Sequence, residues 1–277
     1  MDRNFVSIIM LSHNRGQFVE ESVKSILAQT YTNWELLFYD VNSKDDTGSR
    51  MMELMAQDSR IHVYRMPYRH GTTSAMNAAL KESKGRWIAF LNPGDLWEPE
   101  KLERQVAFME SNGYQFSYTA YQRSSNICAS RTLVQRGPQR VMHGDLERCC
   151  WMRSLAVMCD ARTVGLIQLE DYKYNNDYAL WLKVSEKADC HLLPECLAKL
   201  RTPQSTVMEF LFTDKLNWRY WVYRQELGKN PFVAACMTVR SLWFSLVKRI
   251  RYSEICTLGA SESRRGFPKS DGRDIIV

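Results

Sequence analysis

The first 120 residues alternate between short runs of β-forming residues and segments in which apolar residues recur at helical spacing. The β-rich runs are residues 6–11, 34–40, 61–65, 87–91 and 115–121. Alternation at this pitch predicts βαβ units, in which helices flank a mostly parallel sheet. We therefore predict an α/β fold with a Rossmann-like central sheet.

Later parts of the chain show less regular patterns. Residues 176–186 have the bulk and spacing of a helix, whereas residues 122–160 contain loop-forming residues, and we assign no elements there. Residues 231–252 are strongly apolar, but Arg240 interrupts them before they reach a span of about 20 apolar residues. From Gly259 onward the composition favours disorder.

The charge distribution divides the chain into a neutral body and a basic tail. The net charge is +6, yet residues 1–212 hold 25 basic and 25 acidic residues, while residues 213–277 hold 12 and 6. A neutral body argues against a nucleic-acid groove, and the basic tail favours contact with an anionic membrane surface. The eight cysteines lack metal-binding spacing and no secretory signal is evident, so we expect reduced thiols, no zinc and a cytoplasmic location.

Polar residues follow the first two predicted strands. Ligands of parallel sheets bind at the carboxyl ends of the strands, where Ser12, His13 and Asn14 follow the first strand and Asp40 ends the second. The first turn lacks the glycine-rich sequence of dinucleotide-binding dehydrogenases, which weighs against hydride transfer. We interpret Asp40 as a ligand-binding carboxylate that accepts hydrogen bonds from a base or ribose.

Some polar residues near this edge have a simpler interpretation. Ser43, Asp45 and Asp46 follow Asp40 and are typical of turns and helix caps, which is the role we assign to them. For His13, base contact and a structural role remain open alternatives. Trp87, Trp97 and Trp181 are interpreted as packing residues.

The fourth predicted strand ends in a turn that contains Asn92, Gly94 and Asp95. A Pro-Gly pair makes the turn tight, which places Asn92 and Asp95 side by side at the sheet edge. Their oxygen atoms suit Mg²⁺ or Mn²⁺ bridging a diphosphate, although the same residues are common in turns that bind nothing.

The order of these features resembles the family 2 glycosyltransferases, which have the GT-A fold. The matching segments are residues 6–15, 25–31, 34–40, 58–61, 77–80, 85, 90–97, 176–183, 193–197 and 201. The match covers residues 4–207, in order and at the expected gaps, and is far more specific than any single motif.

The resemblance implies a role for several residues. Asp40 matches the aspartate that binds the nucleotide base, Asp95 the carboxylate that holds a Mn²⁺ or Mg²⁺ ion on the diphosphate, and Asp177 the catalytic base. The nucleotide-sugar site would also include Ser12, His13, Asn14, Asn92 and Gly94. The resemblance also implies a single displacement, which inverts the configuration of the anomeric carbon. UDP is the expected leaving group because it is the most frequent one in the family.

The chain departs from the family pattern at four positions. Asn92 and Gly94 replace aspartates, Met76 replaces an arginine that supports the donor, and Asn176 replaces the glutamate before the base. We interpret the chain as an active but divergent enzyme. A catalytically silent binding module is the alternative, and a nucleotidyltransferase is a second rival without the basic loop that a triphosphate needs.

The resemblance also implies an organisation and a cellular setting. Residues 1–125 would form the nucleotide-sugar half, residues 126–212 the acceptor half, and residues 213–277 a C-terminal helical arm and tail. The expected acceptor is a glycan or lipid-linked glycan of polysaccharide synthesis on the inner face of the cytoplasmic membrane.

Three assignments have competing interpretations. The arm could pack on the body through Trp218, Trp221, Phe232 and Trp243, or lie on the membrane through residues 231–252, which we favour. Glu170 and Asp171 compete with Asp177 for the base role. His70 and Gly71 are weaker candidates for contact with the donor sugar.

Overall fold

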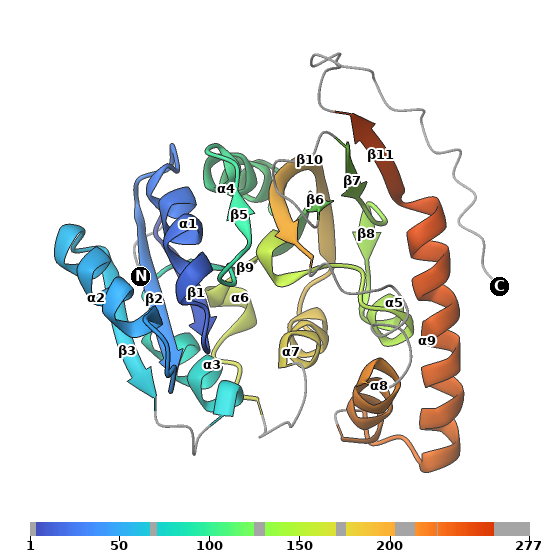
Figure 1. Cartoon of the computed structure of the whole chain (residues 1–277). Helices are drawn as coiled ribbons and strands as arrows, with labels where there is room; N and C mark the ends of the chain where they lie inside the picture. The colour runs from blue at the N-terminus through green and yellow to red at the C-terminus, as the bar shows by residue number, and fades with distance from the viewer. Residues whose placement is uncertain are drawn as a thin grey trace.

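A mixed β-sheet forms the centre of the molecule, with helices on both of its faces (Figure 1). The computed structural model describes residues 4–66, 71–124, 131–169, 176–202, 214–225 and 227–257. Within these residues the sheet has 11 strands, and its main path runs β11-β7-β6-β9-β4-β1-β2-β3, while β5, β8 and β10 pair beside this path.

The amino-terminal half is a parallel sheet, as the sequence predicts. Its strands are β1 (Val6–Ser12), β2 (Trp34–Val41), β3 (Ile61–Met66) and β4 (Trp87–Phe90). The pairs β1–β2, β1–β4 and β2–β3 are all parallel. The connecting helices are α1 (Gly16–Leu27), α2 (Thr47–Gln57) and α3 (Gly71–Glu82). This topology brings the carboxyl ends of β1, β2 and β4 to one edge.

The second half contributes mainly antiparallel pairs. Its elements are β5 (Leu96–Trp97), α4 (Lys101–Asn112), β6 (Phe116–Ser124), β7 (Arg131–Gln135), β8 (Arg140–Val141), α5 (His143–Arg148), the 3₁₀ helix η2 (Ser154–Ala156), β9 (Val157–Asp160), α6 (Ala161–Val164), α7 (Asn176–Ser185) and β10 (Cys190–Arg201). Strand β9 lies between β4 and β6 and is antiparallel to both, whereas β10 pairs in parallel with β6.

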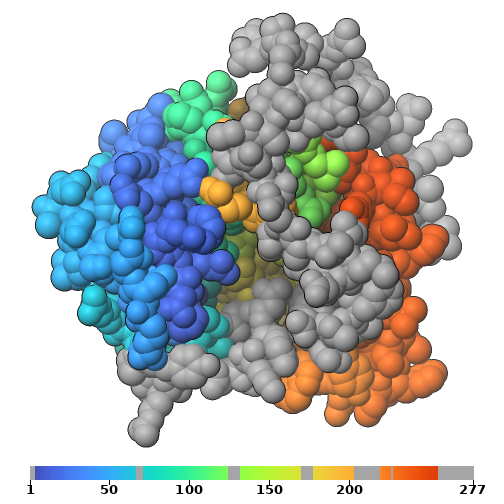
Figure 2. Space-filling view, viewed as in Figure 1, coloured from blue at the N-terminus to red at the C-terminus, as the bar shows by residue number. Residues whose placement is uncertain are grey.

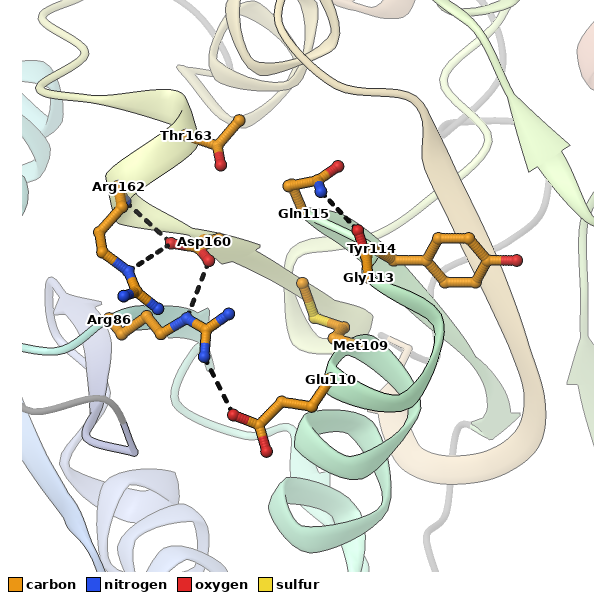
Figure 3. Close-up of a pocket in the computed structure, with 9 residues that line it drawn as sticks. All are labelled: Arg86, Met109, Glu110, Gly113, Tyr114, Gln115, Asp160, Arg162 and Thr163. Atoms are coloured by element: carbon orange, nitrogen blue, oxygen red, sulfur yellow. Dashed lines mark hydrogen bonds and ion pairs between the residues drawn. The ribbon is translucent and has the colours of Figure 1, made fainter.

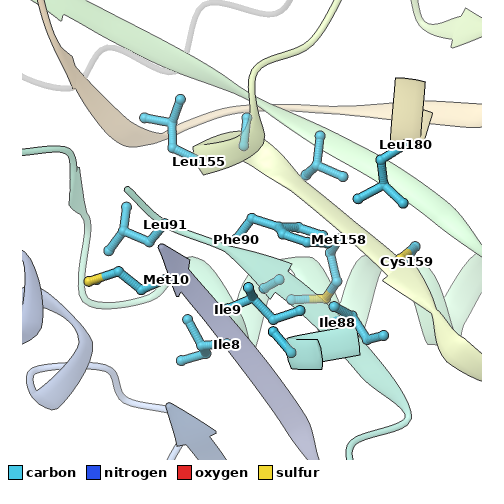
Figure 4. Close-up of a cluster of buried hydrophobic side chains, with 14 of the residues drawn as sticks. Ile8, Ile9, Met10, Ile88, Phe90, Leu91, Leu155, Met158, Cys159 and Leu180 are labelled. Atoms are coloured by element: carbon cyan, nitrogen blue, oxygen red, sulfur yellow. The ribbon is translucent and has the colours of Figure 1, made fainter. Parts of the chain in front are cut away.

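The main hydrophobic core lies where β1, β4, β9 and α7 meet (Figure 4). Ile8, Phe90, Met158 and Leu180 are all almost fully buried. Burial of each such side chain contributes about 1.5–3 kcal/mol. Trp87, Trp97 and Trp181 are buried as well, which confirms their interpretation as packing residues.

The C-terminal arm consists of α8 (Asp214–Gln225), α9 (Pro231–Arg251) and β11 (Ser253–Thr257). Asn230 caps α9 by accepting a hydrogen bond from Val233 N at 2.9 Å, and Pro231 occupies the first turn, where its missing N–H is not needed. Helix α9 runs along the side of the molecule opposite α2 (Figure 1). Within the described residues, no helix is long and apolar enough to cross a membrane.

The arm packs on the body, but not through the expected aromatic residues. Trp221, Phe232 and Trp243 are 50%, 78% and 65% exposed, so the alternative in which they make the packing contact is wrong for these three, and the Trp218 side chain lies outside the described part. Instead, the buried residues of α9 are Ala234, Met237, Thr238 and Ser241, Phe244 packs against the main core, and Lys248 Nζ donates to two backbone carbonyls of residues 150–151. This packing leaves several other large apolar residues of α9 in solvent.

Candidate active site

Two polar side chains of the parallel half meet at the sheet edge. Ser12 on β1 pairs in register with Asp40 on β2, and both side chains are buried. Asp40 Oδ1 accepts a hydrogen bond from Ser43 N at 3.0 Å, whereas Ser12 Oγ has no hydrogen-bond partner in the described structure. A buried carboxylate and an unpaired hydroxyl suit a polar ligand at this edge.

His13 and Asn14 tie the loops after β1 and β2 together. His13 Nδ1 donates to Val41 O at 2.7 Å, and Asn14 Nδ2 donates to His13 Nε2 at 3.2 Å. Asn14 has a positive φ of 52°, and its Oδ1 accepts from Lys44 N at 2.7 Å. Because both imidazole nitrogens are engaged within the protein, these contacts favour the structural alternative for His13.

The polar residues after Asp40 serve the turn, as the sequence predicts. Ser43 Oγ accepts from Asn14 N at 2.9 Å, and Asp45 accepts from Gly16 N at 3.0 Å and from Thr47 N at 3.1 Å. These bonds satisfy backbone donors near the starts of α1 and α2. The loop is therefore held rigidly beside Asp40.

The turn after β4 places Asp95 inside the site and Asn92 at its surface. Asp95 N donates to Asn92 O at 3.1 Å, and Gly94 N donates to Ser22 Oγ of α1 at 2.8 Å. Asp95 is 7% exposed, while Asn92 is exposed. Gly94 has φ +101°, a conformation that side-chain-bearing residues rarely adopt, so an aspartate there would be strained.

Arg201, at the end of β10, holds the turn from the other side. Its backbone N donates to Asp95 Oδ1 at 3.1 Å, and its Nε donates to Gly94 O at 3.1 Å. Its guanidinium also pairs with Glu21 of α1. These contacts fix the position of Asp95, so the arginine that the family resemblance includes has a visible positioning role.

Asp177 lies in the first turn of α7 and enters the same site. It accepts a hydrogen bond from Ser154 Oγ of η2. Burial raises the pKa of Asp177, and the Ser154 hydroxyl and the Arg153 charge partly oppose this rise. A carboxylate with a raised pKa is a better proton acceptor near neutral pH than an ordinary aspartate.

Asp95 has a strongly shifted pKa. Burial raises the pKa of Asp95 to about 7, against the opposing effects of the Arg201 backbone N–H and the charges of Arg153 and Arg201. The negative charge of Asp177 raises this pKa further, which shows that the two carboxylates share one field. Two interacting carboxylates with raised pKa values beside arginines are typical of functional sites.

The donor set fits a metal ion only if the substrate completes it. No group of three or more His, Cys, Asp or Glu side chains that could hold a metal occurs in the described residues. Asp95 offers one carboxylate and Asn92 an amide oxygen. Mg²⁺ is commonly held by one or two carboxylates together with waters and substrate phosphates, so this pair fits an ion that arrives with a diphosphate.

Figure 2 shows the molecular surface hollowed between the blue amino-terminal residues and the orange surface near residue 200. A separate pocket with a volume of about 440 Å³ lies at the amino ends of β4 and β6 (Figure 3). There Arg86 pairs with Asp160 at 2.9 Å and with Glu110 at 3.0 Å. This pocket is at the opposite edge from Asp40 and Asp95, and its charges are neutralised internally.

The family follows from a comparison with known proteins. The model of the family described as "Glycosyl transferase family 2" matches residues 7–165. The chain is 33% identical over 234 residues to the Escherichia coli UDP-Glc:alpha-D-GlcNAc-diphosphoundecaprenol beta-1,3-glucosyltransferase WfgD, covering 83% of this chain and 89% of that protein. The chain belongs to glycosyltransferase family 2.

Other similarities agree with this assignment. The Bacillus subtilis (strain 168) putative teichuronic acid biosynthesis glycosyltransferase TuaG is 30% identical, over 83% of this chain and 91% of that protein. TarS 1–349 of S. aureus in complex with UDP-GlcNAc has a TM-score of 0.64 at 15% identity, covering 88% of this chain and 72% of that one. The Pyrobaculum calidifontis mannosyltransferase PcManGT, in complex with GDP-Man and Mn²⁺, has a TM-score of 0.61 at 13% identity, with 88% and 71% coverage. The likeness to TarS supports the predicted GT-A fold.

The remaining candidate residues of this glycosyltransferase lie in the core, at the start of α3 or outside the described residues. Met76 is buried in the main core, so its side chain does not supply the positive charge of the arginine that the family resemblance has at that position. Gly71 begins α3, whereas His70, Glu170 and Asp171 lie outside the described residues.

No site residue within residues 122–160 was named from the sequence. Arg153 and Ser154 lie beside Asp177, and Arg153 also influences Asp95. The segment between α5 and β9 that positions them is irregular apart from a three-residue 3₁₀ helix. No local signal in the sequence marks such a segment as part of a site.

Proposed function

We propose that this family 2 glycosyltransferase transfers a sugar from a UDP-sugar to a hydroxyl of a lipid-linked diphosphate glycan, with inversion at the anomeric carbon. One observation carries the proposal: the buried carboxylate of Asp95 and the half-buried carboxylate of Asp177 come from opposite halves of the fold and act on each other in one site. The nucleotide and the acceptor class follow those named for WfgD of Escherichia coli.

The donor would lie along the edge formed by β1, β2 and the turn after β4. Ser12 and Asp40 would bind the nucleoside, with His13 and Asn14 holding the loop around it. Asp95 and Asn92 would hold Mn²⁺ or Mg²⁺ on the diphosphate. When bound, the ion supplies positive charge that stabilises the departing diphosphate.

Asp177 would act on the acceptor side. Its carboxylate removes the proton from the acceptor hydroxyl as that oxygen forms a bond to the anomeric carbon and the bond to the UDP oxygen breaks. The proton ends on Asp177 and the electron pair of the broken bond on UDP. Ser154 holds the carboxylate in place, and the raised pKa of Asp177 favours its accepting the proton.

Calorimetric titration of UDP and of GDP, each with and without Mn²⁺, tests this proposal. We expect UDP to bind more tightly than GDP, and the binding to depend on Mn²⁺. If neither nucleotide binds, the turn of residues 92–95 no longer forms a donor site, and the catalytically silent binding module becomes the better hypothesis.

We also propose that α9 lies on the inner face of the cytoplasmic membrane. Its five most exposed large apolar residues are Phe232, Val239, Trp243, Leu246 and Ile250, whereas Val233, at 37%, is the least exposed of this kind and lies off their face. Their spacing of seven, four, three and four places them on one helix face, which we call the α9 stripe. Arg240, Arg249 and Arg251 are exposed on the same helix and would attract anionic lipid headgroups.

Vesicle binding by the full chain tests the α9 stripe. We expect the Trp243→Glu/Ile250→Glu double variant to lose most of its cosedimentation with vesicles containing anionic lipid, because two charges enter the apolar face. Met52→Glu, at an exposed apolar residue of α2, is the matched control and should bind as the wild type does. Equal binding of all three proteins, or a dimer that the double variant abolishes, would contradict a membrane role.

A further inference from the structure

Three arginines from distant parts of the chain gather beside the Asp177 end of the site. Arg123 lies near the end of β6, where it pairs in register with Leu200 of β10 and is therefore next to the position of Arg201. Arg153 immediately precedes Ser154, the residue bonded to Asp177, and its guanidinium is bonded to Tyr121 of β6. Arg123 and Tyr121 are two residues apart, so their side chains leave the strand on the same face.

The third arginine, Arg249, is brought in by the C-terminal arm. Its neighbour Lys248 donates from Nζ to Cys150 O at 3.0 Å and to Trp151 O at 2.6 Å. The rings of Trp151 and Tyr252 also meet edge to face, with centroids 5.6 Å apart. These contacts fasten the last turn of α9 to the segment that leads into Arg153.

The positive charge of this arginine cluster, defined as Arg123, Arg153 and Arg249, is only partly offset in the described residues, where the negative charge of Asp177 acts on Arg153. None of the three has a carboxylate oxygen within 4.0 Å in that part of the chain. Arg123 Nε is buried and has no hydrogen-bond partner there. Burial lowers the pKa of Arg123, Tyr121 opposes this, and the charges of Arg153 and Arg249 lower it further, so the three arginines are close enough to repel one another.

We propose that the arginine cluster binds the diphosphate of a lipid-linked acceptor. The inference rests on the proposed function, because it assigns the contacts of that acceptor. In such an acceptor, a sugar whose hydroxyl lies at Asp177 carries its diphosphate on the anomeric carbon, so only the sugar ring separates the two groups. Arg153 immediately precedes Ser154, which contacts Asp177, and is therefore close to where that diphosphate would lie. Arginine suits this ligand because its planar fork pairs with two phosphate oxygens at once.

The place of Arg249 on the C-terminal arm favours the acceptor diphosphate over the donor diphosphate as the ligand of the cluster. Arg249 lies on the same helix as the α9 stripe and directly precedes Ile250, one of its members. A lipid whose chain enters the membrane beside the stripe would present its diphosphate to Arg249. The donor diphosphate would instead lie by Asp95, in the other half of the fold.

Binding of farnesyl diphosphate to the UDP-saturated full-length protein tests the inference directly. UDP blocks the donor site, so the probe reports on a second diphosphate site. We expect Arg153→Ala and Arg249→Ala each to weaken binding by about tenfold or more, since a charge-assisted phosphate contact is lost. Arg240→Ala removes the same charge from α9 about 13 Å from Arg249 along the helix, and should have no effect. Displacement of the probe by UDP, or equal binding by all variants, would overturn the inference.

Transfer to two acceptors separates this inference from the proposed function. One acceptor carries its sugar on a lipid diphosphate, and the other carries the same sugar on a simple alkyl chain. We expect wild-type kcat/KM to favour the diphosphate acceptor and Arg153→Ala to reduce that preference by about tenfold or more. An unchanged preference would refute the cluster. A wild type that transfers to neither acceptor would refute the proposed function, while farnesyl diphosphate binding would still decide the role of the arginines.

Discussion

Replacing Asp177 by Asn is expected to lower turnover by about 10²–10⁴-fold, because the amide cannot take the proton of the acceptor hydroxyl. Asparagine has the same shape and still bonds Ser154, so the fold and the donor site should be kept. UDP affinity in calorimetry should therefore match the wild type. Steady-state transfer and UDP titration of the same preparation are the measurements.

A matched control for Asp177→Asn is available next to the same helix. Glu186 is exposed just beyond the end of α7, so Glu186→Gln removes a carboxylate without touching the site. Its turnover should equal that of the wild type. If Asp177→Asn keeps wild-type turnover, Asp177 is not the base, and Glu170 or Asp171 becomes the candidate.

Replacing Asp95 by Asn is expected to stabilise the metal-free protein at pH 8 while abolishing metal-dependent UDP binding. The pKa of Asp95 is raised from 3.8 to about 7 in the folded protein. As pH rises, the carboxyl therefore loses its proton at a lower pH in the unfolded protein than in the folded protein. Stability is therefore lost as pH rises from about 4 to 7, and the loss is complete above 7. For this shift the loss is on the order of 4 kcal/mol, which the uncharged amide avoids.

Urea unfolding of both proteins at pH 4 and pH 8, without metal, measures this effect. The variant should be more stable than the wild type at pH 8 and about equal to it at pH 4. Asp58→Asn is a control of opposite sign, because the hydrogen bond from Arg60 lowers the pKa of Asp58. A metal-free Asp95→Asn variant that is less stable than the wild type at pH 8 would contradict the burial of an unfavourable charge.

The same experiment connects stability to function. Mn²⁺ with UDP should raise the stability of the wild type by binding at Asp95, and it should leave the Asp95→Asn variant unchanged. The buried carboxylate of Asp95 thus lowers the stability of the metal-free wild type, and such a loss of stability is common at functional sites. If Mn²⁺ and UDP stabilise both proteins equally, Asp95 does not hold the metal.

Local sequence patterns determined the amino-terminal half of this protein. The parallel strands β1 to β4 and their helices follow from local patterns, because each strand is a run rich in β-forming residues and the helices between them have apolar residues at helical spacing. The end of such a strand also predicts where Asp40 and Asp95 lie, since ligands bind at that edge. The boundaries of α7 were likewise predictable to within one residue.

Tertiary structure alone decided how the second half completes the site. Strand β9 has only four residues and exists because β4 and β6 supply partners on both sides. The arginine cluster joins β6, the segment before η2 and α9, which are far apart in sequence. The sequence predicted an apolar helix at residues 231–252, but the packing of α9 on residues 150–151 determines which of its faces meets solvent. Helical periodicity is a local property, whereas the partner that covers one helix face comes from long-range contacts.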